Sequence, residues 1–229
     1  MSKRHSMGER GNDQRVADGT AGASARREHE RRKANREKRV RDKHPRIGGL
    51  VLALGEPPRH ERAWAQGASG EEYVAERLAK YLNDGACVLH DRRITGSRTN
   101  IDHIVIAPSG VWVVDSKRGY RGNVAVTNPL FGSAKLTIAG RDQTKLVAGV
   151  EKQVGLIERA LGVIAPKTPV HGALCFVDAD LPVLGNLRLH GISLLHPKRL
   201  SKRINAKPTL SPQRVREVAN ELAERFPSA

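Results

Sequence analysis

Two apolar segments joined by a short turn form the clearest hydrophobic pattern in the chain, over residues 100–117 (NIDHIVIAPSGVWVVDSK). The residues Ala107–Gly110 predict a tight turn, because proline presets its own dihedral and glycine suits the fourth position. Pairing the two ends of that turn places Asp102 opposite Asp115 and puts both on one face with Lys117. Both faces are otherwise apolar, which is typical of central strands covered by helices on each side.

The rest of the chain alternates helical and strand-like patterns. The helices are expected at 68–82, roughly 142–162 and about 212–226, and the strands at 86–94, 122–128, 135–140, 171–178 and 191–197. The last helix has a clear start signal, with Ser211 as N-cap and Pro212 in the first helical position. This order predicts an α/β fold in which a mixed sheet is flanked by helices.

Two of these helices carry a polar residue on an apolar stripe. In 68–82, Ser69 and Glu72 have the spacing of a capping box, whereas Glu71 lies on the stripe that faces the core. A carboxylate there either needs a buried partner or looks outward past the core and favours the helix dipole. Gln153 on the stripe of the second helix is, from periodicity, most simply a satisfied core amide.

Charge changes this picture, because the chain is strongly basic: 40 Lys and Arg against 24 Asp and Glu give a net charge of +16. Residues 1–46 alone hold 15 basic and 7 acidic residues and are expected to form a largely disordered or helical arm, helical over 25–45. Residues 47–229 are expected to form the globular domain. The excess of positive charge favours nucleic acid as partner, and the scarcity of aromatics favours backbone contacts. The alternative for the arm is a solubilising tail.

Several classes of protein are disfavoured by the sequence. The N-terminal MSKRHSMGERGND lacks the apolar core of a signal peptide, and the run 47–55 is too short to span a bilayer. Cys87 and Cys175 lie in apolar strand-like segments without metal-ligand spacing, so we expect reduced, buried thiols. A cytoplasmic protein without membrane contact is expected.

The opposed aspartates of the hairpin need an explanation, since like charges facing each other destabilise a sheet. Such a pair is stable if Asp102 and Asp115 share a proton or bind a cation. The simpler alternative is that Lys117 neutralises Asp115 at a wet strand end. A register slip of one residue would undo the pairing.

Three motifs in this order resemble the PD-(D/E)XK nuclease superfamily and, more closely, its nuclease-related domain (NERD) family. They are GASGEEYVAERL (67–78), NIDHIVIAPSGVWVVDSK (100–117) and KQVGLIERAL (152–161), with weaker similarity through 170–182 to 196–204. The resemblance implies a restriction-endonuclease-like αβββαβ core with a divalent metal at the end of the hairpin. The site residues that it implies are Glu71, Asp102, Asp115, Lys117 and Gln153. One departure is Ile101, where the superfamily often has proline.

The resemblance suggests a metal-dependent nuclease. Hard carboxylate oxygens favour Mg²⁺ or Mn²⁺. The hypothesis is that Asp102, Asp115, the Ser116 carbonyl and Glu71 hold the metal, while Lys117 orients water and stabilises the phosphate. Flanking arginines are candidate phosphate contacts: Arg93, Arg98, Arg118 and Arg121.

Two rival functions remain, a non-catalytic nucleic-acid-binding module and a regulatory scaffold. Strand alternation turns His103 away from Asp102, so a packed or hydrogen-bonded histidine is expected there. Asp178 and Asp180 follow a strand, and their two interpretations are a metal-binding pair and a loop or helix-capping role.

Overall fold

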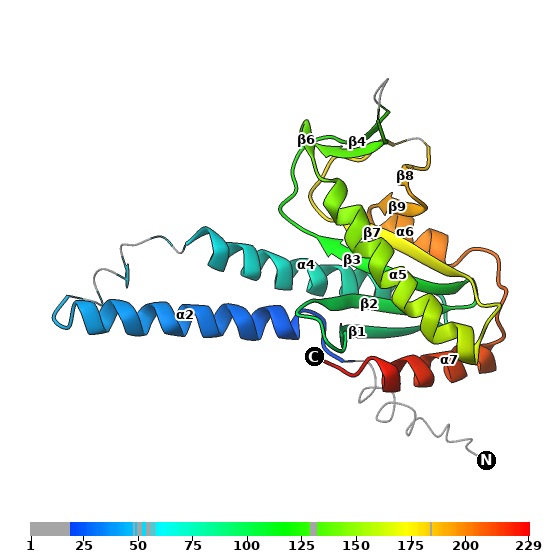
Figure 1. The fold of residues 1–229 in the computed structure, drawn as a ribbon, viewed down its shortest axis with the longest axis horizontal. Helices are drawn as coiled ribbons and strands as arrows, with labels where there is room; N and C mark the ends of the chain where they lie inside the picture. Colours follow the sequence, from blue (N-terminus) through cyan, green and yellow to red (C-terminus); the bar gives the residue numbers. More distant parts are fainter. Residues whose placement is uncertain are drawn as a thin grey trace, which may run out of the picture.

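A six-stranded mixed sheet forms the centre of the protein (Figure 1). The computed structural model describes residues 19–47, 49, 52–53, 56, 58–128, 132–183 and 185–229. The sheet has the order β1-β2-β3-β7-β9-β8. Its strands are β1 (Cys87–Arg93), β2 (Asn100–Ala107), β3 (Gly110–Lys117), β7 (Val170–Phe176), β9 (Ile192–Leu195) and β8 (Arg188–Leu189).

Helices cover both faces of the sheet, as predicted. On one face, α4 (Arg59–Tyr81) packs on β3 and α6 (Pro197–Ile204) packs on β7. On the other, α5 (Thr144–Ile164) crosses β3, β7 and β9, and α7 (Pro212–Arg225) covers β1 and β2. The sequence order α4-β1-β2-β3-α5-β7 gives the expected αβββαβ core, with β3 and β7 parallel. The start of α7 is also confirmed, since the Ser211 hydroxyl accepts a hydrogen bond from the backbone N–H of Arg214 at 3.2 Å.

The hairpin has the predicted register. Ala107 pairs with Gly110 and Ile104 with Val113, so the predicted turn residues close the hairpin. The apolar side chains on the two faces of β2 and β3 are buried in two separate cores, one under α4 and α6 and the other under α5 and α7. This burial on both sides explains why the strands read as continuous hydrophobic runs.

Two predicted strands exist but lie outside the main sheet. The segments form β4 (Val124–Thr127) and β5 (Lys135–Ile138), which pair with each other, and β5 also pairs with β6 (Arg141–Asp142) to complete a small antiparallel sheet. Their apolar side chains join the core on the α5 side. The strand propensity of a segment does not determine which sheet the strand belongs to.

The predicted capping box is wrong, because α4 begins at Arg59, ten residues before Ser69. The Ser69 hydroxyl donates to the backbone carbonyl of Gln66 at 3.0 Å, and Glu72 forms an ion pair with Arg26. Good helix formers precede Ser69 and carry the helix through the apparent start signal.

A long helix, α2 (Ala23–Lys43), lies along α4, and both project beyond the sheet (Figure 1). This confirms the helix predicted over 25–45, whereas most of the segment 1–24, expected to be disordered, lies outside the described residues. The contact is specific: the buried Glu61 side chain pairs with Arg36 at 3.2 Å, and His29 Nδ1 lies 3.0 Å from the Glu61 carbonyl. The division of the chain at residue 46 stays a prediction.

None of the helices that the structure describes combines the length and the hydropathy needed to cross a membrane.

Candidate functional site

Three aspartates form a row across three neighbouring strands. The β1–β2 register places Asp91 opposite Asp102, and the β2–β3 register, continued by one residue, places Asp102 opposite Asp115. All three side chains line one cavity at the open end of the hairpin. The predicted pair of opposed carboxylates is therefore part of a larger acidic group.

Glu71 joins this row from α4. The helix approaches the end of β3 closely: a Cβ added to Gly70 would lie 2.8 Å from the Cβ of Arg118, so the small residue permits the approach. The carboxylate of Glu71 accepts a hydrogen bond from the backbone N–H of Gly22 at 2.9 Å. Burial, followed by the charges of Asp91 and Asp115, raises the pKa of Glu71 to about 7.

Asp102, in the middle of the row, also has a raised pKa. Its Oδ2 accepts a hydrogen bond from the Ser116 N–H at 2.7 Å. Burial raises the pKa of Asp102 well above its ordinary value, and the carboxylates of Asp115 and Glu71 raise it further. In the absence of a bound metal ion, Asp102 and Glu71 therefore retain protons at pH values where free carboxyls are ionised.

Lys117 supplies positive charge beside the row. Its Nζ lies 2.6 Å from Asp115 Oδ2, and it donates to the Ser116 carbonyl at 3.4 Å. Burial lowers the pKa of Lys117, but the charges of Asp115 and Asp102 outweigh this effect and raise the pKa overall. The neutralising pair considered from the sequence is thus present, and it keeps the lysine charged.

Two histidines, His103 fully buried and His90 half-buried, support β3 on the side away from the row. His103 is fully buried, and its Nε2 lies 2.9 Å from the Ser116 hydroxyl oxygen. Its Nδ1 lies 2.8 Å from the Nδ1 of His90. Burial lowers the pKa of both rings, that of His90 to about 4. The expectation of a hydrogen-bonded histidine at position 103 is confirmed.

Asp91, which was not among the predicted site residues, fixes the start of α2. Its carboxylate accepts hydrogen bonds from the Ser24 N–H at 2.6 Å, the Ser24 hydroxyl at 2.7 Å and the Asn100 amide at 2.9 Å. Helices begin with unpaired N–H groups, and here Asp91 and Glu71 satisfy two of them from other parts of the fold. The feature of the sequence that could have identified Asp91 is its position as an aspartate inside the strand-like segment ACVLHDRRI.

Asp91→Ala is expected to lower the free energy of unfolding by about 1–2 kcal/mol, because it leaves the donors of Ser24 and Asn100 without their acceptor. It should also speed hydrogen exchange in the first turns of α2. Denaturant titration and exchange mass spectrometry would measure the two effects. Glu30→Ala, on an exposed part of α2, is the control. Unchanged exchange in Asp91→Ala would contradict the capping role.

The acidic row forms one wall of a cavity of about 1100 Å³. Residues of α2, α4 and α5 complete its lining, among them Trp64, Lys152 and Gln153. The Gln153 amide donates to the Asn100 carbonyl at 3.2 Å, but its Oε1 is buried without a hydrogen-bond partner. Gln153 is therefore only partly the satisfied core amide that periodicity indicated, because its acceptor oxygen stays without a partner.

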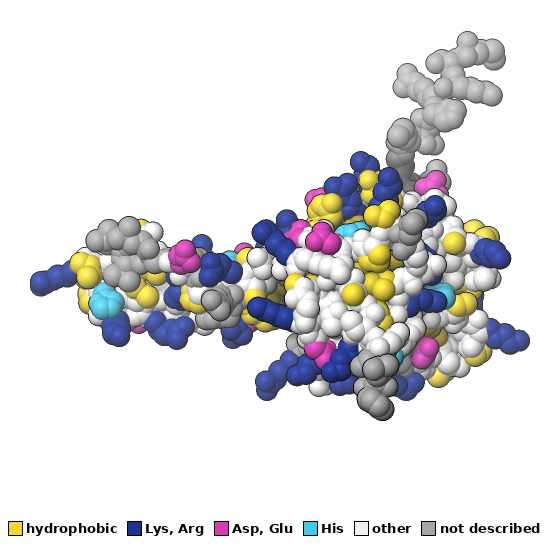
Figure 2. All heavy atoms as spheres, turned by 90° about the horizontal axis from the view of Figure 1, so that it is seen from above, with side chains coloured by type: hydrophobic (Ala, Val, Ile, Leu, Met, Phe, Trp, Pro, Cys, Tyr) yellow, Lys and Arg dark blue, Asp and Glu magenta, His cyan; other side chains and the backbone are white. Residues whose placement is uncertain are grey.

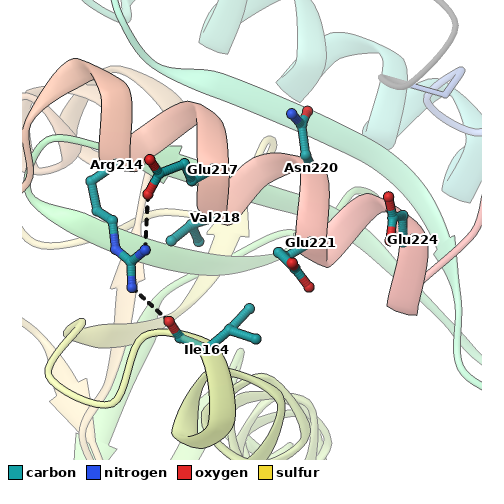
Figure 3. A pocket seen from close by; sticks show the side chains of 7 residues that line it. All are labelled: Ile164, Arg214, Glu217, Val218, Asn220, Glu221 and Glu224. Carbon is teal, nitrogen blue, oxygen red and sulfur yellow. Dashed lines mark hydrogen bonds and ion pairs between the residues drawn. The ribbon is translucent and has the colours of Figure 1, made fainter.

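A second, smaller cavity of about 450 Å³ lies between the end of α5 and α7 (Figure 3). Arg214 spans it, donating to the Ile164 carbonyl at 2.6 Å and to the Glu217 carboxylate at 2.9 Å. None of the predicted site residues lines it. These contacts join α7 to α5, so the residues around this cavity have a structural role.

The arginines predicted as phosphate contacts differ in their distance from the large cavity, because only one of them is among its lining residues. Arg98 lines the large cavity, whereas Arg118 donates to the Ser69 carbonyl at 3.2 Å and lies 3.7 Å from Asp178. Asp178 also accepts a hydrogen bond from the Gly119 N–H at 3.1 Å, which is a loop-fixing role. Neither Arg93 nor Arg121 lines the cavity; both are exposed.

The donors that line the large cavity are mainly carboxylate and amide oxygens. Within the described ranges, no three His, Cys, Asp or Glu side chains form a ready-made metal cluster. The chemistry nevertheless fits a hard divalent cation, because two carboxylates with raised pKa values, Glu71 and Asp102, line the same cavity as Gln153, whose Oε1 has no hydrogen-bond partner. Mg²⁺ commonly completes its coordination with water, so two or three protein oxygens suffice.

Comparison with known proteins gives one match. A family model described as nuclease-related domain, NERD, matches residues 66–177. No curated protein and no solved structure matches the chain. The matched segment runs from the middle of α4 to the end of β7 and contains all the predicted site residues. It leaves out α2, which closes one side of the cavity.

Proposed function

We propose that the protein hydrolyses phosphodiester bonds of DNA or RNA with Mg²⁺ or Mn²⁺, and the match of residues 66–177 to the nuclease-related domain model supports this. The observation that carries the proposal is the acidic row at the open end of the hairpin. Burial and mutual repulsion raise the pKa of Asp102 and Glu71, and a bound cation would relieve that repulsion.

The metal would be held by Asp102 and Asp115, with the Ser116 carbonyl and Glu71 as further oxygen donors. The free Oε1 of Gln153 is a further candidate, directly or through water. When bound, such a cation lowers the pKa of water and offsets negative charge on a phosphate. The donors are all hard oxygens, which favours Mg²⁺ or Mn²⁺ over softer metals.

Lys117 has an electrostatic role in this proposal. Its pKa is raised, so it stays protonated at neutral pH and cannot serve as a general base. A protonated amine beside the acidic row can bind a phosphate oxygen and stabilise the extra negative charge of the pentavalent transition state. The contact with Asp115 holds it in position.

The net charge of +16 supports a nucleic acid as substrate, because phosphate backbones attract a basic protein over long distances. The ion pair between Lys117 and Asp115 favours a second candidate, a nucleic-acid-binding module without catalysis, since it accounts for one carboxylate without a metal.

The test is cleavage of plasmid DNA, single-stranded DNA and structured RNA by the purified protein with Mg²⁺ or Mn²⁺. We expect EDTA to stop cleavage and Lys117→Ala to slow it by about 10²-fold, the usual effect of removing one transition-state donor. Lys167→Ala, at an exposed lysine outside the cavity lining, should leave the rate unchanged. Binding without cleavage under either metal would replace the nuclease by the binding module.

A further inference from the structure

The large cavity has an acidic wall and a basic, aromatic rim. The acids belong to the proposed catalytic row, while the rim carries Arg31, Trp64, Arg98 and Lys152 from α2, α4, the β1–β2 connection and α5. A polyanion that reached the acids would thus pass cations first. The rim is built from four separate parts of the fold, so it is not a property of one charged helix.

Trp64 is the exceptional residue of this rim. It is 38% exposed although it is one of only two tryptophans, and the other, Trp112, is buried. The guanidinium of Arg32 lies 5.6 Å from the centre of its ring. An exposed indole beside cations is the combination with which proteins stack unpaired bases while holding the phosphates.

The cations of the rim differ in their partners. Arg31 and Arg32 share the Glu28 carboxylate, at 2.7 and 2.5 Å. Arg98 and Lys152 are exposed and have no ion pair within the described part of the chain. Arg98 and Lys152 are therefore freer than Arg31 and Arg32 to contact phosphates.

The rim continues outward along α2. That helix has ten Lys and Arg against four acids, a net charge of +6. Lys38 follows Arg31 by seven residues, about two turns, so both lie on the face that borders the cavity. Figure 2 shows Lys and Arg side chains along the projecting arm that α2 and α4 form.

We propose that the cavity admits an unpaired strand of nucleic acid, which runs along α2, stacks a base on Trp64 and enters between Arg98 and Lys152. The proposal rests on the proposed nuclease function and specifies its substrate class. Stacking requires a free base face, which the paired and stacked interior of a duplex does not offer. A duplex can meet the outer cations but not this indole.

Binding in EDTA tests this proposal separately from cleavage. Fluorescence anisotropy would compare a labelled 15-nucleotide single strand with a duplex of the same sequence. Trp64→Ala is expected to weaken binding of the single strand by about tenfold, the usual effect of losing one stacked base, and to leave the duplex within twofold. Trp64→Phe should retain most of the affinity. Equal loss for both ligands, or no loss, would overturn the proposal.

The cations are tested in the same assay. Lys152→Gln and Arg98→Gln should each weaken single-strand binding and reduce its dependence on salt, whereas Arg216→Gln on the exposed side of α7 should not. If Arg216→Gln weakens single-strand binding as much as Lys152→Gln does, the strand does not enter specifically between Arg98 and Lys152.

Quenching of tryptophan fluorescence reports the stacking directly. Addition of the single strand should quench the wild-type protein and leave Trp64→Phe, which keeps only Trp112, unquenched. Deoxy- and ribo-oligonucleotides would both be used, and the tighter one identifies the polymer. If the Asp115→Ala protein still binds the single strand but no longer cleaves it, both proposals are supported. If the wild-type protein binds the single strand as expected but never cleaves it, only the proposed nuclease function is rejected.

Discussion

Replacing Asp102 with asparagine should reduce metal-dependent cleavage by about 10³-fold and make the metal-free protein more stable. Activity falls because asparagine is a poorer ligand for a hard cation. Stability rises because the substitution removes a carboxyl group that must either stay protonated or be ionised against burial and against the charges of Asp115 and Glu71, both of which raise its pKa. The asparagine oxygen can still accept the hydrogen bond from Ser116. We expect a gain of about 1–2 kcal/mol in the free energy of unfolding.

Asp115→Asn is the matched comparison. It should reduce cleavage to a similar extent but lower stability by about 2 kcal/mol, because Lys117 then loses its partner at 2.6 Å in a largely buried position. Two aspartates that face each other across the hairpin are thus expected to affect stability in opposite directions.

Urea denaturation at pH 7.5 in EDTA, together with the plasmid assay, would measure both effects. Adding Mn²⁺ should stabilise the wild type and leave Asp102→Asn unchanged. A metal-free Asp102→Asn protein that is less stable than the wild type would show that the acidic row is not under repulsion.

The hairpin was predictable because its determinants are local. A turn with proline and glycine fixes the register, and the register alone places Asp102 opposite Asp115. The apolar runs of both strands then follow from helices on each face. The residues that the family resemblance implied, Glu71 and Gln153, line the same cavity.

The parts that could not be predicted depend on distant contacts. Asp91 lies opposite Asp102 only because the irregular connection between β1 and β2 sets their register. The docking of α2 depends on two hydrogen bonds between residues that are far apart in the sequence. Gly22 and Glu71 are separated by 49 positions, and Ser24 and Asp91 by 67. The early start of α4 and the separate small sheet likewise reflect packing that no local pattern encodes.

The stability of the metal-free protein should fall as pH rises from about 4.5 to 7. The Glu71 carboxyl has a pKa near 4.5 in the unfolded chain and about 7 in the folded protein. Between these values the folded state holds a proton that the unfolded state has released, so raising the pH favours unfolding. For Glu71 the loss is at most about 3 kcal/mol, and Asp102, whose pKa is also raised, adds to it in the same direction.

Urea titrations at pH 5, 6, 7 and 8 in EDTA would measure this slope, and Glu71→Gln should flatten it. Glu72→Gln, one residue along α4 in the pair with Arg26, is the matched control and should keep the wild-type slope. Saturating Mn²⁺ should also flatten the slope in the wild type, because a cation that replaces the shared proton removes the repulsion. A slope that is the same with and without Mn²⁺ would mean that the acidic row does not bind the metal, and the proposed nuclease would lose its main support.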